Sequence, residues 1–227
     1  ETLKLPEQAG LAIQALGPGL VLLIKDLNGN HVVQRCLQRL SPADAEFIYL
    51  AAGKHCVEIA THRHGCCVLQ RCVDHATEEQ RDRLVTEIAA NAFTLAQDPF
   101  GNYVVQYILE LGVASATSKV MIQLAPEAPA LSLQKFSSNV IEKCLKLGGP
   151  ELERERELMV RQVMVSPLLP RMLQDAFGNY VVQSSLTVAK GTLHAELVEH
   201  IKPHLAAIKS SPYGKRILAR SHLFQKK

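Results

Sequence analysis

The sequence predicts an all-α protein in which units of about 36 residues repeat along the chain and stack into a solenoid. The first observation is that the heptapeptide FGNYVVQ occurs twice, at 100–106 and at 177–183. The second is that apolar residues recur around each copy at helical spacing. The third is that four related heptapeptides fall in the same register: NGNHVVQ at 28–34, HGCCVLQ at 64–70, FSSNVIE at 136–142 and YGKRILA at 213–219.

The spacing of the six heptapeptides gives the boundaries of the units. Their last residues are 34, 70, 106, 142, 183 and 219, so four steps are 36 residues long and one is 41 residues long. We expect one domain over 1–227, made of a leading helical segment, five repeats and a partial C-terminal capping repeat: 1–17, 18–53, 54–89, 90–125, 126–166, 167–202 and 203–227. The five extra residues of the fourth repeat are expected within 147–156, where alternating Glu and Arg predict a solvated helix face.

Each heptapeptide is predicted to lie on a helix, named here the motif helix. An apolar residue stands seven positions before the third residue of every heptapeptide: Leu23, Ile59, Leu95, Leu131, Met172 and Ile208. Apolar pairs follow that third residue: Val32 and Val33, Val68 and Leu69, Val104 and Val105, Val140 and Ile141, Val181 and Val182, Ile217 and Leu218. Together they predict one buried stripe per helix.

The sequence also indicates how the helices begin and why they must stack. A glycine precedes the motif helix in five copies, and Ser137 replaces it in the fourth. A second helix is predicted in each unit, for example over 77–92, where Thr77 is the expected N-cap. Helices this short cannot bury their own apolar faces, so neighbouring repeats must cover them.

Composition limits the class of protein. Of the 227 residues 47% are hydrophobic, which is enough to bury a core, and the net charge of +3 permits a nucleic-acid partner without requiring one. There is no run of 18 apolar residues and no signal peptide, so we expect a soluble, cytoplasmic protein with no membrane partner.

The six cysteines form no CxxC pair, so we expect reduced thiols that pack as small hydrophobic side chains. A metal site at HRHGCC, 62–67, is the alternative, but zinc ligands usually come as spaced pairs on both sides of a site. The sequence therefore predicts no metal and no cofactor.

Three positions of the heptapeptide vary in a way that packing does not explain. The third residue is named edge one, the fourth the stack residue and the seventh edge two. By repeat they are Asn30, His31 and Gln34; Cys66, Cys67 and Gln70; Asn102, Tyr103 and Gln106; Ser138, Asn139 and Glu142; Asn179, Tyr180 and Gln183. The two edges are four residues apart and therefore share one face of a helix, beside the stack residue.

Two polar tips beside a planar or compact residue, once per repeat, suit flat ligands in a row, and nucleobases are such ligands. The alternative is that the asparagines cap helices and bond neighbouring repeats. That alternative accounts for edge one, but not for the Gln at edge two or for the Tyr between the edges.

The segments NGNHVVQRCL, DPFGNYVVQYILE, QKFSSNVIEKCLK and SPYGKRILA closely resemble the Pumilio (PUF) family of RNA-binding proteins. The resemblance covers the chain from about residue 18, and six motifs share one register. It implies a curved α-solenoid of three-helix Pumilio repeats that binds single-stranded RNA on its concave face, one base per repeat, antiparallel to the protein. The units are similar to repeats four to eight of that family and to its flanking C-terminal repeat.

The resemblance also implies which base each repeat takes. Asn with Gln implies uracil at Asn30/Gln34, Asn102/Gln106 and Asn179/Gln183. Cys66 with Gln70 implies adenine, and Ser138 with Glu142 implies guanine, whose N1–H and N2–H a carboxylate accepts together. The expected element is 5′-UGUAU in mRNA 3′ untranslated regions, with post-transcriptional regulation of translation and stability. The convex face is expected to be free for protein co-regulators, and no small-molecule substrate is expected.

The remaining candidate residues stack on bases or attract phosphate. His31, Cys67, Tyr103, Asn139 and Tyr180 are the expected stacking residues, although Cys67 stands where the family usually has arginine. Basic residues near the edges are expected to supply positive potential or touch phosphate, or else to be solvated or paired with acids: Arg35, Arg71, Lys143, Lys215 and Arg216.

Other functions have less support in the sequence. GxSxG, HExxH and phosphate-loop motifs are absent, so no enzyme is predicted. A protein-binding helical scaffold would not need polar edges matched to bases in every repeat. A ribosome-biogenesis relative of the same family would have scrambled base-binding triplets, whereas five triplets here are intact.

Overall fold

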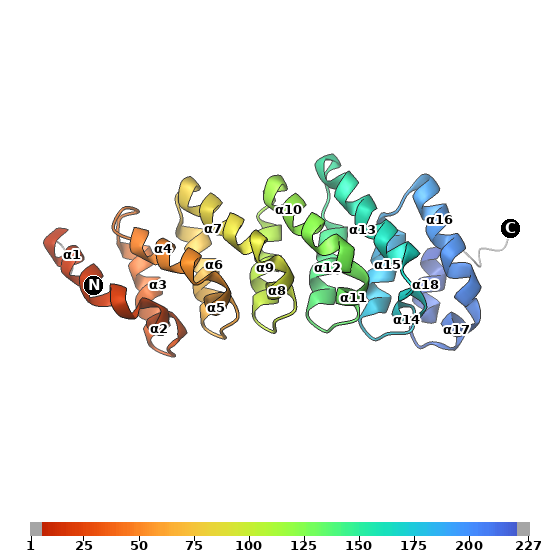
Figure 1. The fold of residues 1–227 in the computed structure, drawn as a ribbon, viewed down its shortest axis with the longest axis horizontal. Coiled ribbons are helices and arrows are strands. Elements are labelled where there is room, and N and C mark those ends of the chain that lie inside the picture. Colours follow the sequence, from red (N-terminus) through yellow and green to blue (C-terminus); the bar gives the residue numbers. More distant parts are fainter. Residues whose placement is uncertain (1–5, 222–227) are drawn as a thin grey trace. The chain divides into compact units, whose positions relative to one another are not determined.

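The computed structural model describes residues 6–221, which contain eighteen α-helices, four short 3-10 helices and no strand. The chain divides into two compact units between Ile108 and Leu109, inside α9 (Gly101–Glu110). Within each unit successive repeats lie side by side, as Figure 1 shows. In this part of the chain no helix is long and apolar enough to cross a membrane.

The first five repeats contain a short helix, the motif helix and an outer helix, and the described part of the last repeat contains a short helix and the motif helix. The short helices are α2 (Leu20–Lys25), α5 (Cys56–Ala60), α8 (Ala92–Ala96), α11 (Ala128–Ser132), α14 (Leu169–Met172) and α17 (Leu205–Ser210). The motif helices are α3 (Gly29–Arg39), α6 (Gly65–His75), α9, α12 (Ser137–Lys146), α15 (Gly178–Val188) and α18 (Gly214–Ser221). The outer helices are α4 (Glu46–Lys54), α7 (Glu78–Ala90), α10 (Ala114–Leu124), α13 (Glu153–Val165) and α16 (Gly191–Ile201). The helix α1 (Pro6–Leu16) precedes them.

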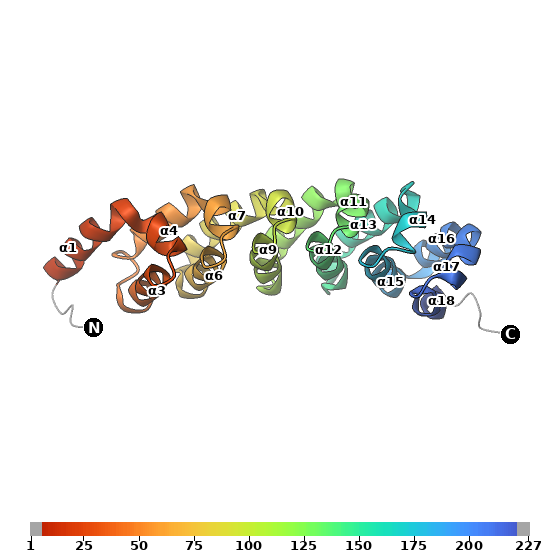
Figure 2. The same ribbon diagram turned by 90° about the horizontal axis from the view of Figure 1, so that it is seen from below.

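Helices of one kind pack against each other within a unit. In the first unit α3 packs on α6 and α4 packs on α7. In the second unit α12, α15 and α18 form one row, while α10, α13 and α16 form another (Figure 2). Each unit therefore has a face of motif helices and a face of outer helices, which confirms the predicted all-α stacking of repeats.

The predicted apolar stripe forms the core. Ile59, Leu95 and Met172 are fully buried, as are most of the apolar pairs of the motif helices. Val32 differs, because 46% of its surface is exposed while its neighbour Val33 is buried. Only α1 and a 3-10 turn precede the first repeat in the described chain, so no earlier motif helix covers Val32.

Close packing explains both the glycine before the motif helix and its one replacement. A Cβ atom at Gly65 would lie 2.2 Å from the main-chain oxygen of Ile59, which no side chain tolerates without movement of the backbone. In the fourth repeat Ser137 stands at this position, and its hydroxyl donates to the oxygen of Leu131 at 2.7 Å. The steric conflict is replaced there by a hydrogen bond to the corresponding carbonyl.

The outer helices α4 and α7 are joined by a polar contact. Thr77 and Gln80 form a capping box at the start of α7, which confirms the predicted N-cap. The Gln80 amide also donates to Glu46 at 2.8 Å, and Arg83 donates to the other oxygen of Glu46 at 2.6 Å. These two hydrogen bonds, that of Gln80 first, hold the pKa of Glu46 below its ordinary value.

The segment 147–156 corrects one sequence prediction. It contains a 3-10 turn, Pro150–Leu152, and the start of α13, and most of its charged residues are exposed. Arg156, however, is buried, because its guanidinium turns inward and donates to Glu153 at 2.6 Å and to the main-chain oxygen of Gly149 at 3.1 Å. Arg156 therefore holds the connection to α12 in place instead of lying on a solvated face.

Candidate nucleic-acid interface

The fifteen predicted edge and stack residues lie in the first two turns of five motif helices, and their exposure follows their position. Every edge-one residue is buried, every stack residue is exposed, and edge two is half-buried in the first four repeats and buried in the fifth. The same order therefore recurs in each repeat: an inward residue, an outward residue, and a partly covered polar tip one turn later.

The three Asn–Gln pairs share one hydrogen-bond pattern. The Nδ2 group of each Asn donates to two main-chain oxygens in the turn before the motif helix, at 2.7–3.0 Å. Its Oδ1 atom accepts from Nε2 of the Gln one turn later, at 2.8–2.9 Å. The pairs are Asn30 with Gln34, Asn102 with Gln106 and Asn179 with Gln183.

This pattern fixes which way the Gln amide faces. A main-chain carbonyl oxygen only accepts, so the Asn must turn its nitrogen to the helix start and its oxygen to the Gln. The Gln must then present its nitrogen to the Asn. Among the described residues this leaves Oε1 and the second N–H of Nε2 without a partner in Gln34 and Gln106, whereas Oε1 of Gln183 accepts from Arg220. Asn30, Asn102 and Asn179 are only 5%, 2% and 0% exposed, so most of each edge-one side chain is covered by the protein.

Sequence reasoning missed an aspartate that precedes each of these pairs. Asp26, Asp98 and Asp175 lie three residues before the glycine, and Oδ1 of each accepts two main-chain N–H groups at 2.6–2.9 Å. The N–H groups of Gly29 and Asn28 hold the pKa of Asp26 below its ordinary value. The signal that was available is the pattern D-x-x-G-N, which occurs in the three Asn repeats and in none of the others.

The second repeat lacks this arrangement. The thiol of Cys66 lies 3.6 Å from the main-chain oxygen of Arg63 and 3.9 Å from the thiol of Cys67. Burial raises the pKa of Cys66 to about 12, so its thiol is neutral. Among residues 6–221 no side chain holds the amide of Gln70, which can therefore turn either its nitrogen or its oxygen outward.

The fourth repeat presents a carboxylate. Oε1 of Glu142 accepts from Nζ of Lys146 at 2.5 Å and from the hydroxyl of Ser184, on the next motif helix, at 3.1 Å. The side chain of Glu142 remains 23% exposed, and Ser138 lies one turn before it with its hydroxyl on the oxygen of Lys135 at 3.4 Å. The carboxylate is thus held by Oε1, while Oε2 has no hydrogen-bond partner among the described residues.

The stack residues are the exposed members of each triplet. Tyr103 and Tyr180 are 58% and 43% exposed, which is high for aromatic side chains on a packed helix. His31, Cys67 and Asn139 are exposed at the equivalent positions. An aromatic face left open to solvent, as at Tyr103 and Tyr180, is a platform on which a flat ligand can stack.

Three of the predicted basic residues have partners within the protein. Arg71 pairs with Asp74 at 3.0 Å, and Lys143 pairs with Glu110 of α9. Arg35 donates to the amide oxygen of Gln38 at 3.2 Å. Arg71 and Lys143 therefore follow the alternative expectation, in which these basic residues pair with acids.

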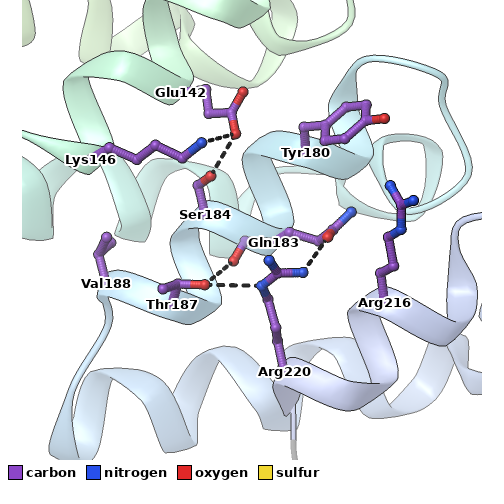
Figure 3. Close-up of a pocket in the computed structure, with 9 residues that line it drawn as sticks. All are labelled: Glu142, Lys146, Tyr180, Gln183, Ser184, Thr187, Val188, Arg216 and Arg220. Atoms are coloured by element: carbon purple, nitrogen blue, oxygen red, sulfur yellow. Dashed lines mark hydrogen bonds and ion pairs between the residues drawn. The ribbon is translucent and has the colours of Figure 1, made fainter.

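The other two predicted basic residues lie on α18. Arg216 is exposed and lines an open pocket of about 650 Å³, together with Tyr180, Gln183 and Arg220 (Figure 3). Lys215 belongs to the same helix, but its side chain lies outside the described part of the structure. Arg216 occupies the register position that stack residues hold in the other repeats.

A second feature that sequence reasoning missed is a series of contacts between neighbouring motif helices. The residue directly after edge two bonds the preceding motif helix in the pairs Tyr107 with Asp74, Lys143 with Glu110, Ser184 with Glu142, and Arg220 with Gln183. In the first two pairs the partner lies four residues after edge two. In the last two pairs the partner is the edge-two residue itself.

All six cysteines are free thiols, and Cys67 is the exposed one. Among residues 6–221 no three His, Cys, Asp or Glu side chains lie close enough together to hold a metal ion.

Comparison with known proteins identifies relatives of the chain. A model of the Pumilio-family RNA-binding repeat matches residues 20–50, 55–89, 91–121, 128–156 and 171–202. The chain is 49% identical to the chloroplastic pumilio homolog 7 of Arabidopsis thaliana over 98% of this chain, and 48% identical to pumilio homolog 12 of the same plant over 96% of this chain. It spans 34% and 36% of the length of these two relatives.

Solved structures give the same result. The Puf4 RNA-binding domain bound to an HO endonuclease RNA 3′ UTR recognition sequence is 43% identical, with a TM-score of 0.83 over 97% of this chain and 70% of that one. The RNA-binding domain of yeast Puf5p bound to SMX2 RNA is 29% identical, with a TM-score of 0.84 over 98% of this chain and 70% of that one. The fold is therefore the all-α solenoid of repeats found in these domains.

Proposed function

Because the chain belongs to the Pumilio family of RNA-binding repeat proteins, we propose that it binds single-stranded RNA at a 5′-UGUAU element, one base per repeat. The observation that carries the proposal is the recurring order of a buried edge one, an exposed stack residue and a polar edge two in five motif helices. Neither the packing of the repeats nor the capping of the helices requires that order.

The three uracil positions follow from the fixed Gln amide. Uracil has its N3–H donor at the place where adenine has its N1 acceptor, and O4 where adenine has its N6 amino group. A Gln with Oε1 and one N–H free can accept from N3–H and donate to a neighbouring uracil oxygen at the same time. Asn30, Asn102 and Asn179 prevent the amide from turning round, so each pair of edge residues favours uracil over adenine.

The other two positions follow from what replaces the Asn clamp. At Gln70 the amide is not held, so it can present the reversed order of donor and acceptor that adenine requires. At Glu142 a carboxylate has only acceptors, and guanine has two adjacent donors on its Watson–Crick edge, N1–H and N2–H. Ser138 and Cys66 are small side chains at edge one and leave room beside these bases.

Stacking supplies affinity that is independent of sequence. A base on an aromatic face contributes about 1–3 kcal/mol, so Tyr103 and Tyr180 are expected to contribute most and Cys67 least. The 3′ UTR sequences bound in related structures support a target in untranslated regions of mRNA. The proposal also includes post-transcriptional control of such messages, protein co-regulators on the outer helices and a cytoplasmic location. Because chloroplastic relatives exist, organelle fractionation is the test of the location.

The proposal is tested by fluorescence anisotropy at fixed salt, with labelled RNA that contains UGUAU and with the same RNA after its G is changed to A. We expect the change to weaken binding by about 1–3 kcal/mol, the usual value of one well-matched base contact. Equal affinity for both RNAs would overturn base recognition and favour contacts to the backbone alone. Absence of binding to either RNA would overturn the RNA-binding proposal and favour a protein-binding scaffold.

A further inference from the structure

Ser184 connects the motif helix of the fifth repeat to the edge-two residue of the fourth. Its hydroxyl donates to Oε1 of Glu142 at 3.1 Å, which joins α15 to α12 (Figure 3). Ser184 is only 4% exposed, and within residues 6–221 the carboxylate is the one hydrogen-bond partner of its hydroxyl. A buried donor aimed at one oxygen restricts the direction in which the whole carboxylate can point.

The length of the side chain directly after edge two decides what it reaches on the preceding motif helix. Tyr107 reaches past edge two to Asp74, four residues later. Lys143 does the same with Glu110. The side chain of Ser184 is shorter and reaches edge two itself. Serine is the one small residue at this position, where the other copies have Arg35, Arg71, Tyr107, Lys143 and Arg220.

The charges of the fourth repeat also differ from those of the two repeats before it. In those two repeats edge two is a neutral Gln, and the residue four positions later is an acid, Asp74 or Glu110. In the fourth repeat edge two is the acid, and the residue four positions later is Lys146, which pairs with Glu142 at 2.5 Å. Side chains four apart on a helix are neighbours, so acids at both positions would repel each other.

Lys146 and Ser184 hold the Glu142 carboxylate to different degrees. The Lys146 side chain is 61% exposed, and ion pairs of exposed side chains do little to fix a geometry. The last torsion of a Glu side chain has broad minima, so a carboxylate held by the lysine alone can rotate. Ser184 is buried on a packed helix, and its hydroxyl therefore supplies the fixed point.

The acceptor sites that remain on Glu142 suit guanine. An ionised carboxylate has about four lone-pair sites, of which Lys146 and Ser184 take two, both on Oε1. The remaining sites match in number the N1–H and N2–H donors of guanine. Solvent reaches Oε2, since the buried side-chain atoms without a partner in the described chain belong to three other residues: Glu155, Arg156 and Ser185.

We propose that Ser184 is a positioning residue of the Ser138/Glu142 pocket, whose hydroxyl fixes the Glu142 carboxylate so that it accepts both donors of guanine together. This inference rests on the proposed RNA-binding function and deepens it. Ser184 is buried and acts through Glu142, without contact to the base. The preference of the fourth repeat for guanine therefore depends on a side chain of the fifth.

The test measures the affinities of the wild-type chain and of Ser184→Ala for RNAs that carry G, A or inosine as the second base of UGUAU. Loss of the hydrogen bond that fixes the carboxylate predicts that the ratio of G to A affinities falls about threefold to tenfold. Inosine keeps N1–H but lacks the amino group, so it reports whether both donors are used. The wild-type chain should prefer G to inosine, whereas Ser184→Ala should bind these two RNAs within about twofold of each other.

Two controls separate positioning from packing. Ser185→Ala is the matched variant, because Ser185 is the next residue of α15, is fully buried and has a hydroxyl with no hydrogen-bond partner in the described structure. This variant should keep the G to A ratio of the wild-type chain. In a Glu142→Ala background, Ser184→Ala should change the ratio no further, because the hydroxyl acts only through the carboxylate. Circular dichroism melts show whether each variant is folded.

The possible results separate the two levels of inference. If the wild-type chain does not distinguish G from A, both the proposed guanine pocket and the role of Ser184 are wrong. If the wild-type chain prefers G and Ser184→Ala keeps the ratio, only the role of Ser184 is wrong. If Ser185→Ala lowers the ratio as much, or if Ser184→Ala weakens binding to all three RNAs equally, the hydroxyl supports the packing of α15 and the inference is overturned.

Discussion

The substitution Glu142→Gln tests the proposed guanine position most directly. Glu142 is held by Ser184 and Lys146 through Oε1 only, so its second oxygen is available to a ligand. Gln has nearly the same shape as Glu, and its remaining oxygen can still accept from Ser184 and Lys146. The other acceptor oxygen is replaced with an amide NH2 group. That amino group would meet a donor of guanine, so one hydrogen bond is lost and two donors face each other.

The expected loss of selectivity is larger than the expected loss of stability. A hydrogen bond to a charged group contributes about 1.5–3 kcal/mol, so the preference for G over A should fall about 10- to 100-fold. The ion pair of Glu142 with Lys146 is largely exposed, with 61% of the Lys146 side chain in solvent, and such pairs contribute at most about 1 kcal/mol. The melting temperature should therefore fall by no more than a few degrees.

The assay is anisotropy with UGUAU and UAUAU RNAs, together with a thermal melt of each variant. Glu110→Gln is the matched control, because it makes the same change of charge on the preceding motif helix and also removes a carboxylate paired with a lysine, Lys143. We expect the control to keep the G to A ratio of the wild-type chain. Equal ratios in both variants would refute the assignment of Glu142 to guanine.

Three further predictions concern stability and reactivity. Gly65→Ala should destabilise the fold by about 1–3 kcal/mol because of overpacking. Gly53→Ala should instead stabilise α4 by about 0.5–1 kcal/mol, because a Cβ atom there meets nothing within 4 Å. A denaturant titration that ranks the two variants the other way would contradict the packing argument. Burial raises the pKa of Cys144 to about 12, so iodoacetamide at pH 8 should label exposed Cys67 first, and mass spectrometry that finds Cys144 labelled equally fast in the folded chain would disprove the protection. Because folding lowers the pKa of Glu46, this carboxylate stabilises the fold above its unfolded pKa of about 4.3, and the stabilisation is lost as the pH falls through the folded pKa. Glu46→Gln should therefore flatten the decline in stability below about pH 5. An acid unfolding profile identical to that of the wild-type chain would contradict this prediction.

The sequence was sufficient for the repeat architecture because packing imposes a period on it. The apolar residue seven positions before edge one must fill the same place in every repeat, and Ile59, Leu95 and Met172 do so. The glycine before each motif helix is equally strict, since the backbone of the short helix passes within contact distance of its missing Cβ. Features that repeat because of packing can be recognised without coordinates.

The direction of the edge side chains could not be obtained in the same way. Helical spacing places Asn30 and Gln34 on one face, but it does not say that the Asn amide turns back to the carbonyls of the preceding turn. That direction depends on the conformation of the turn, which Asp26 sets through two main-chain N–H groups. The aspartate was visible in the sequence, but its effect on edge two passes through two further hydrogen bonds.

Contacts between repeats were the hardest to foresee, and they limit how far each repeat acts as an independent module. In the first repeat Gln34 is oriented by groups of its own repeat, through Asn30 and the turn that Asp26 fixes. In the fourth and fifth repeats Glu142 and Gln183 are also held by the following motif helix. If the first repeat is moved to another position in the stack, its base preference should move with it. The preferences at Glu142 and Gln183 should move intact only when the helix that follows them moves as well, because part of each pocket belongs to its neighbour.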